Sequence, residues 1–165
     1  MKILIVDDEK PARDYCKQLL AEQFPECVLV AETDNVCSAY EAILIHNPDL
    51  VLLDVDLPDG TAFDMLKRFP QISFSIIFIT AYEQFALQAI KFSALDYLLK
   101  PYTSGEFAES IRKAFKKKEQ AEMQTRLSAL YQNMQTQQQP TKIVLRTADS
   151  IHVIQLDNIV RLQAD

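Results

Sequence analysis

The 165-residue chain has no tryptophan, only two glycines and three cysteines, and no long apolar segment. The glycines, Gly60 and Gly105, are too far apart to form the glycine-rich loop of a dinucleotide-binding fold. The cysteines, Cys16, Cys27 and Cys37, are odd in number and contain no C-x-x-C pair. We therefore expect free thiols rather than a disulfide framework or a zinc site.

Two further absences bear on location and partners. No apolar run reaches the length of about 18 residues that a membrane span needs, and the N-terminus lacks the pattern of a signal peptide. We therefore expect no membrane contact and a cytoplasmic location. The net charge is −6 and the sequence shows no basic patch, which argues against the chain itself being a free-standing DNA-binding protein.

What the sequence does contain is typical of a globular protein, with 48% hydrophobic and 24% charged residues. Five short apolar runs fall at residues 2–6, 28–31, 50–53, 76–79 and 94–99. Because these runs are almost continuously apolar, we expect strands that are buried on both faces, as in a parallel sheet between helices.

The segments between these runs have helical periodicity. Thr103 followed by Glu106 forms a capping box at the start of the last helix, and Pro11 suits the first turn of the first helix. The alternation predicts an α/β fold with a doubly wound, five-stranded parallel sheet. With no dinucleotide motif, the flavodoxin-like strand order 2-1-3-4-5 is favoured.

Polar residues follow four of the five predicted strands, at the edge of the sheet where parallel strands end and ligands bind. They are Asp7, Asp8, Glu9, Asp54, Asp56, Thr80 and Lys100. Carboxylates held together repel one another unless a cation neutralises them. Because the group offers only oxygen ligands, it favours a hard ion such as Mg²⁺.

The same residues could carry out phosphoryl transfer. Asp54 is a carboxylate that can form an acyl phosphate, Lys100 supplies a fixed positive charge, and Thr80 supplies a hydroxyl donor. Each of these residues alone could equally be a helix cap or a solvated side chain. The combination of all of them at one edge favours a phosphoryl site.

Four motifs resemble those of the receiver domains of two-component response regulators. They are VDDE at 6–9, LLDVDLPDG at 52–60, ITA at 79–81 and DYLLKP at 96–101, and the resemblance covers residues 1–118. It implies that Asp54 is the phosphoacceptor. It also implies that Mg²⁺ is held by Asp8, Asp54 and the backbone carbonyl of Asp56, with Asp7 acting through water.

The resemblance implies roles for four more residues. Thr80 would hydrogen-bond a phosphoryl oxygen, and the Lys100 side chain would bridge to the phosphoryl group. The peptide bond between Lys100 and Pro101 would be cis. Tyr97 would be the aromatic switch that alters the surface of helix four, strand five and helix five. The partners implied are a sensor histidine kinase and, on phosphorylation, a second copy of the chain.

Residues 119–140 have the composition of a helical linker. Met123, Leu127, Leu130 and Met134 are spaced by 4, 3 and 4 residues, which makes a seam of two heptads. The seam is either the stripe of a helix extension or the contact of a dimer-forming linker, and the sequence leaves both interpretations open.

Apolar and polar residues alternate within residues 141–165, as they do at the start of a β-rich module. Residues 142–146 and 150–156 read as two strands joined by a turn at Ala148-Asp149. They resemble the opening strands of LytTR-type DNA-binding domains, which implies control of transcription. We expect the module to be incomplete here, so that DNA would be contacted by the missing C-terminal part of the full-length protein.

Two alternative functions follow from the same residues. The chain could be an interaction module that is never phosphorylated. It could also be a phosphatase of the haloacid dehalogenase type, because Asp54-Val55-Asp56 resembles the D-x-D pair of that family. That family carries its D-x-D on the first strand, which argues against it. We do not expect the chain to be an enzyme that acts on other molecules. We expect it to catalyse only its own phosphorylation and dephosphorylation.

Overall fold

The computed structural model describes residues 1–135, 142–146 and 150–155. The chain divides into two compact units, with the boundary between Phe115 and Lys116. Among the described residues, no helix combines the length and the apolar character needed to cross a bilayer.

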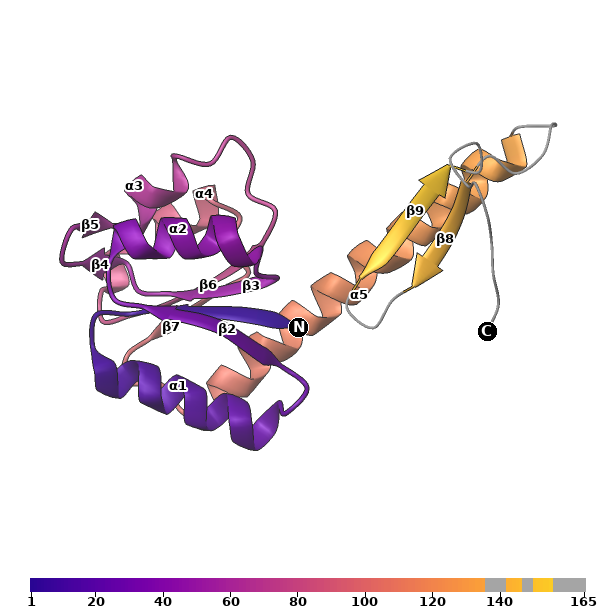
Figure 1. The fold of residues 1–165 in the computed structure, drawn as a ribbon. Helices are drawn as coiled ribbons and strands as arrows, with labels where there is room; N and C mark the ends of the chain where they lie inside the picture. Colours follow the sequence, from indigo (N-terminus) through magenta and orange to yellow (C-terminus); the bar gives the residue numbers. More distant parts are fainter. Residues whose placement is uncertain (136–141, 147–149, 156–165) are drawn as a thin grey trace. The chain divides into compact units, whose positions relative to one another are not determined.

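The first unit is built on a five-stranded parallel sheet (Figure 1). Its strands lie in the order β2-β1-β3-β6-β7, which confirms the predicted order 2-1-3-4-5. Their bounds are Lys2–Val6 for β1, Val28–Thr33 for β2, Leu50–Leu53 for β3, Ser75–Thr80 for β6 and Asp96–Leu99 for β7.

Helices cover both faces of this sheet (Figure 1). One face carries α1 and the beginning of α5, and the other carries α2, α3 and α4. The bounds are Lys10–Gln23 for α1, Val36–His46 for α2, Ala62–Leu66 for α3, Ala86–Lys91 for α4 and Ser104–Gln135 for α5, with a 3-10 turn, η1, at Glu83–Phe85.

Alternate side chains of the strands enter two separate cores, as the pleat of a strand requires. Ile3 and Ile5 pack with α1 and α5, whereas Leu4 and Val6 pack with the helices of the opposite face. Both pairs are at most 1% exposed. Burial on both faces thus explains the apolar runs of β1, β3 and β6. The prediction was wrong for the edge strands β2 and β7, which are partly exposed because each has a neighbouring strand on one side only.

Two helices, α5 and α1, begin where the sequence motifs predicted. The Thr103 hydroxyl accepts a hydrogen bond from the Glu106 amide at 3.2 Å, and the Glu106 carboxylate accepts one from the Thr103 amide at 2.8 Å. This is the reciprocal pairing of a capping box. Pro11 lies in the first turn of α1, also as predicted.

One small element was not predicted. β4, Asp56–Leu57, pairs antiparallel with β5, Gly60–Thr61. Two-residue strands are too short to leave a periodic signal in a sequence. Gly60 has a φ of 147°, a conformation that favours glycine, so one of the two glycines of the chain serves this turn.

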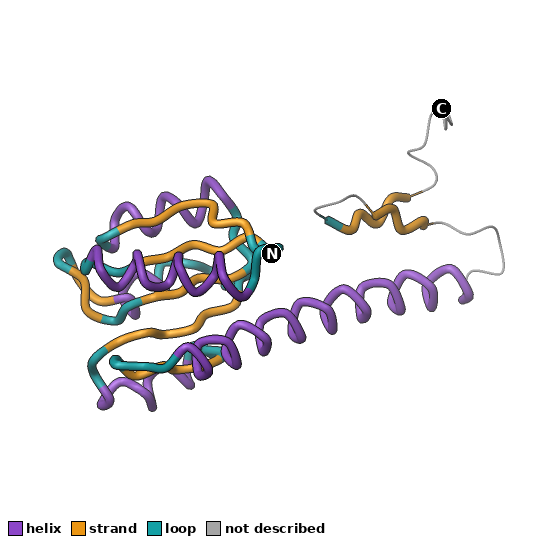
Figure 2. Tube along the Cα trace, turned by 90° about the horizontal axis from the view of Figure 1, so that it is seen from below, coloured by secondary structure: helices purple, strands orange, loops and turns teal. Residues whose placement is uncertain are grey.

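The second unit contains the rest of α5 and a hairpin. Figure 2 shows α5 as one unbroken helix, on which Met123, Leu127 and Leu130 are exposed. Strands β8, Lys142–Arg146, and β9, Ile151–Gln155, pair antiparallel and confirm the predicted hairpin. The predicted turn at Ala148-Asp149 lies outside the described residues.

Candidate functional site

The acidic residues predicted to meet do lie together at the carboxyl edge of the sheet. Asp7 and Asp8 follow β1, and Asp54 follows β3, the neighbouring strand. Carboxylate oxygens of the three residues lie within 4.8 Å of one another. Asp7 and Asp54 are 4% and 7% exposed, whereas Asp8 is exposed. The edge therefore holds a compact set of oxygen donors that opens to solvent on one side.

Lys100, at the end of β7, is the cation of this group. Its Nζ lies 2.7 Å from Asp7 Oδ2 and 2.8 Å from Asp54 Oδ2, with Glu9 Oε2 at 3.4 Å. Burial by itself would lower the pKa of Lys100, but the bonds to Asp54 and Asp7 outweigh it and raise the pKa above its usual value. Lys100 is therefore a permanent positive charge beside Asp54.

Asp7 is held by several neighbours. Its Oδ1 accepts a hydrogen bond from the Glu9 amide at 3.0 Å, and its backbone oxygen accepts one from Arg13 at 2.7 Å. Burial raises the pKa of Asp7, and the contact with Lys100 offsets only part of that increase. A further positive charge in this group would favour the ionised form of Asp7.

The Asp54 carboxylate is oriented at both of its oxygens. Oδ1 accepts a hydrogen bond from the Val55 amide at 2.6 Å, and Oδ2 accepts one from Lys100. No histidine or cysteine joins the three aspartates in the clustered group found among the described residues. The donor set thus fits a hard cation such as Mg²⁺.

Thr80, at the end of β6, offers an unused donor. The residue is fully buried, and its Oγ1 has no hydrogen-bond partner within the part of the chain that the structure describes. A buried hydroxyl without a partner costs about 1–3 kcal/mol. Such a group next to a polar edge is available to donate a hydrogen bond to a ligand.

Replacing Thr80 with valine, which has nearly the same shape, should therefore separate stability from function. We expect the unphosphorylated protein to become more stable by about 1 kcal/mol because an unpartnered polar group is removed. Phosphorylation by an acyl phosphate should slow roughly 10²-fold. Urea unfolding and intact-mass kinetics measure the two effects.

Thr33 provides the matched control for this substitution. Its Oγ1 is also buried without a partner among the described residues, but Thr33 belongs to β2 and not to the acidic group. Thr33→Val should give a similar gain in stability with unchanged phosphorylation. Equal phosphorylation rates in the two variants would contradict a role for Thr80.

The remaining predicted residues lie nearby. Tyr97 is half-buried, its ring centroid is 6.0 Å from that of Phe78, and its hydroxyl donates a hydrogen bond to the Tyr82 backbone oxygen. The peptide bond between Lys100 and Pro101 is cis. The exposed Asp56 carboxylate accepts a hydrogen bond from the Tyr82 hydroxyl at 3.2 Å.

Sequence reasoning missed two neighbours of the site, Arg13 and Tyr82. Tyr82 comes two residues after Thr80, so its distance from the strand end was a signal that could have found it. Arg13 lies within α1, and nothing in the sequence around it points to the backbone of Asp7. Its contact depends on how α1 packs.

Comparison with known families identifies the family to which this fold belongs. A family model described as the response regulator receiver domain matches residues 3–112. The chain belongs to the response regulator receiver family. The receiver domain thus covers the five-stranded sheet and the helices around it.

Curated relatives of this receiver chain match almost its whole length. The sensory transduction protein LytT of Bacillus cereus is 35% identical over 163 residues, which are 97% of this chain and 64% of the relative. The transcriptional regulatory protein LytR of Staphylococcus aureus is 34% identical over 167 residues, with the same coverage. The chain thus spans 64% of the length of these relatives.

Solved structures agree on the receiver fold. The response regulatory domain of protein mrkE from Klebsiella pneumoniae superposes with a TM-score of 0.67 at 28% identity, over 73% of this chain and 99% of that chain. The receiver domain of AraT, a response regulator from Geobacillus stearothermophilus, superposes with the same TM-score at 30% identity, over 73% and 97%.

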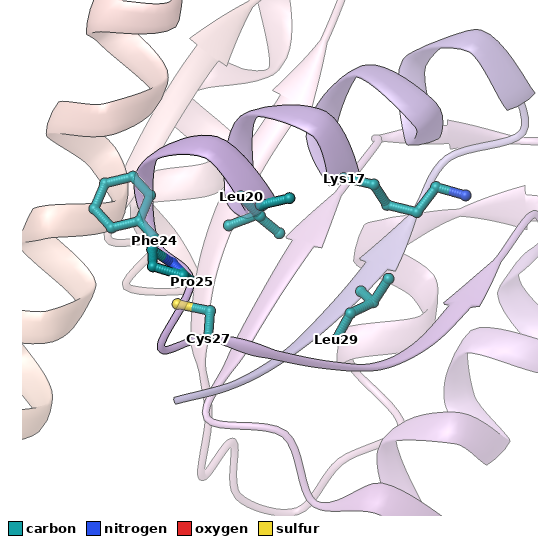
Figure 3. A pocket seen from close by; sticks show the side chains of 7 residues that line it. Lys17, Leu20, Phe24, Pro25, Cys27 and Leu29 are labelled. Carbon is teal, nitrogen blue, oxygen red and sulfur yellow. The ribbon is translucent and has the colours of Figure 1, made fainter.

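A pocket elsewhere in the receiver domain offers no comparable chemistry. It lies between α1 and β2 and is lined mainly by apolar side chains, with Lys17 at one end (Figure 3). Lys17 Nζ is already paired at 2.8 Å with both Asp14 and Glu32. Because the charge of Lys17 is matched, the pocket presents no set of convergent polar groups like that formed by Asp7, Asp8, Asp54 and Lys100.

Proposed function

We propose that this receiver domain accepts a phosphoryl group on Asp54 from a sensor histidine kinase, in a reaction that requires Mg²⁺. One observation carries the proposal. The Asp54 carboxylate is buried and oriented between a permanent cation, Lys100, and two further aspartates, at the same edge as the unpartnered hydroxyl of Thr80.

The oxygen-only donor set of Asp7, Asp8 and Asp54 fits Mg²⁺. The carboxylates of Asp8 and Asp54 and the backbone carbonyl of Asp56 would hold the ion, with Asp7 acting through a water molecule. When bound, Mg²⁺ supplies positive charge against the phosphoryl oxygens.

In the transfer step, a carboxylate oxygen of Asp54 forms a bond to phosphorus. The bond between phosphorus and the imidazole nitrogen of the kinase breaks, and the imidazole keeps its electron pair. Lys100 opposes the negative charge of the phosphoryl oxygens throughout, because its raised pKa keeps it protonated. The Thr80 hydroxyl donates a hydrogen bond to one of these oxygens.

The switch would then pass from Thr80 to Tyr97. If Thr80 turns toward the phosphoryl group, it leaves space into which the half-buried Tyr97 ring can move. That movement would alter the surface of α4, β7 and α5 and favour a homodimer. Phosphorylation would thus change the charge locally, and this change would shift the Tyr97 region from one arrangement to another.

The output proposed for the full-length protein is control of transcription in the cytoplasm. The β8–β9 hairpin supports this, because it lies where the sequence resembles the opening of a LytTR-type domain. The Staphylococcus aureus relative is named as a transcriptional regulatory protein, which also supports this output. DNA contacts would come from further residues of that domain.

Binding of Mg²⁺ should stabilise the receiver domain, and this tests the metal site apart from phosphorylation. At a concentration near 100 times its dissociation constant, Mg²⁺ should add about 2.7 kcal/mol to the free energy of unfolding, seen as a higher melting temperature. Asp8→Asn should remove most of this effect, because it replaces a charged ligand by a neutral one.

Asp14→Asn is the control for the metal prediction. Asp14 is an exposed aspartate on α1, and within the described part of the chain it forms ion pairs with Lys10 and Lys17. Its replacement should leave the Mg²⁺-dependent shift unchanged. The same shift in all three proteins would argue against Asp8 as a ligand of the ion.

A further inference from the structure

The loop between β1 and α1, residues 7–9, is held along its backbone by one residue of α1. Arg13 Nη1 donates a hydrogen bond to the backbone oxygen of Asp7 at 2.7 Å and to that of Asp8 at 3.2 Å. The Arg13 amide donates a third bond, to the Glu9 backbone oxygen at 3.2 Å. A single residue thus binds three consecutive carbonyl oxygens of this loop.

The same loop carries two of the three clustered aspartates. The Asp7 carboxylate is held separately, because it accepts a hydrogen bond from the Glu9 amide and pairs with Lys100. The Asp8 carboxylate is exposed, so its direction depends mainly on the backbone that carries it. The bonds from Arg13 to that backbone are therefore placed to orient Asp8.

Arg13 is itself held by charge and by packing. Its side chain is 13% exposed, and its Nε lies 3.7 Å from Glu32 Oε2 on β2. Lys17, one turn further along α1, pairs at 2.8 Å with the same Glu32 oxygen and at 2.8 Å with Asp14. Two cations here face two carboxylates, so the guanidinium charge is matched locally.

We propose that Arg13 is a positioning residue for the Mg²⁺ site: by holding the carbonyl oxygens of residues 7–9 it fixes the direction of Asp8 and so sets the affinity of the site for the ion. A guanidinium donates several hydrogen bonds from a rigid plane, which suits a group that holds adjacent carbonyls. The inference rests on the proposed function of the acidic edge, and it adds a residue outside the ligand set that controls metal binding.

The charge and the geometry of Arg13 predict opposite effects on Mg²⁺ binding. Removing a positive charge near the acidic edge should by itself tighten the binding of a cation. Losing a group that orients a metal ligand should weaken it. Because Glu32 matches the charge of Arg13, we expect geometry to dominate. Arg13→Gln should therefore raise the Mg²⁺ dissociation constant by about 10-fold, as is typical for the loss of a group that orients a ligand.

Two further variants separate the guanidinium from its charge. Arg13→Lys keeps the charge but replaces the planar group by a single ammonium, and should raise the dissociation constant by about 3-fold. Lys17→Gln is the matched control, because it removes a positive charge that pairs with the same Glu32 oxygen and lies on the same helix. Lys17→Gln should not raise the dissociation constant.

A double variant tests whether Arg13 acts through Asp8. If it does, the two single losses share one cause. The double variant of Arg13→Gln and Asp8→Asn should then bind Mg²⁺ no more weakly than Asp8→Asn alone.

The Mg²⁺ dependence of phosphorylation gives a readout that loss of stability alone would not move. Arg13→Gln should need about 10-fold more Mg²⁺ than the wild type to reach its half-maximal rate with acetyl phosphate. At saturating Mg²⁺ its rate should return to that of the wild type, because Asp54, Thr80 and Lys100 are unchanged. A lower rate that Mg²⁺ does not restore would contradict a role in metal binding.

The experiment uses the full chain, and the rise in melting temperature with Mg²⁺ concentration gives the dissociation constant of each variant. No response in the wild type would overturn the proposed metal site and this inference with it. A response in the wild type, with an equal or lower dissociation constant in Arg13→Gln, would overturn the inference alone. Should Arg13→Gln fail to fold, Arg13→Lys decides, and a dissociation constant equal to that of the wild type would overturn the inference.

Discussion

Replacing Asp54 with asparagine should abolish phosphorylation of the chain. An asparagine side chain has the shape of aspartate, and its one carbonyl oxygen can still accept one of the hydrogen bonds that Val55 and Lys100 donate to Asp54, so the domain should fold. Its amide cannot act as the carboxylate nucleophile that forms an acyl phosphate. Incubation with Mg²⁺ and acetyl phosphate, followed by intact-mass measurement, should show full labelling of the wild type and none of the variant.

The same samples report on the switch. Light scattering should show a shift toward the dimer for the labelled wild type and no shift for Asp54→Asn. Asp14→Asn, which changes an exposed carboxylate outside the acidic group, should behave as the wild type. Labelling of Asp54→Asn at the wild-type level would mean that another residue is the acceptor.

Replacing Lys100 with methionine should have the second large effect, on both rate and stability. The variant loses the cation that opposes charge on the phosphoryl oxygens, so phosphorylation should slow by roughly 10²–10³-fold. It also leaves the buried Asp7 and Asp54 without their cation, which should cost about 3 kcal/mol of unfolding free energy at neutral pH. The cost is moderated by the partial solvent access of the site.

The pH dependence of this variant has a definite sign. Without Lys100, burial and repulsion raise the pKa of Asp7 further above its unfolded value. A carboxyl whose pKa is raised in the folded state takes up its proton more readily there, so it destabilises the fold at neutral pH. Lowering the pH through the raised pKa should therefore recover part of the lost stability, and so should adding Mg²⁺.

Lys67→Met controls for the loss of a lysine ion pair. Lys67 Nζ also lies 2.8 Å from a carboxylate, that of Asp64, but both side chains are more than 60% exposed. An exposed pair contributes less than about 1 kcal/mol. Equal destabilisation of Lys67→Met and Lys100→Met in urea unfolding would contradict the structural role assigned to Lys100.

The parts of the fold that could be predicted are those with a strong one-dimensional pattern. Continuous apolar runs located all five strands of the sheet, and the Thr103 and Glu106 pair located the start of α5. Because parallel strands end at one edge, the position of Asp7, Asp8 and Asp54 in the sequence was enough to predict that they meet.

Other features depend on packing that a sequence does not display. The β4–β5 pair is too short for periodicity, and the bond from Tyr82 to Asp56 depends on the paths of two loops. The length of α5 is a different case. Residues 119–135 belong to α5, and residues 136–140 of the predicted linker lie outside the described residues. The exposed seam at Met123, Leu127 and Leu130 has the same spacing whether it lies in solvent or in a dimer.

The most direct test of the central claim is to locate the phosphoryl group by chemistry. The wild-type chain would be labelled with acetyl phosphate and Mg²⁺, reduced with borohydride to trap the acyl phosphate, and mapped by peptide mass spectrometry. We predict a single modified residue, Asp54, with labelling that disappears when Mg²⁺ is removed. Modification at Asp56 or Asp8 instead, or no modification of a folded domain, would contradict the account.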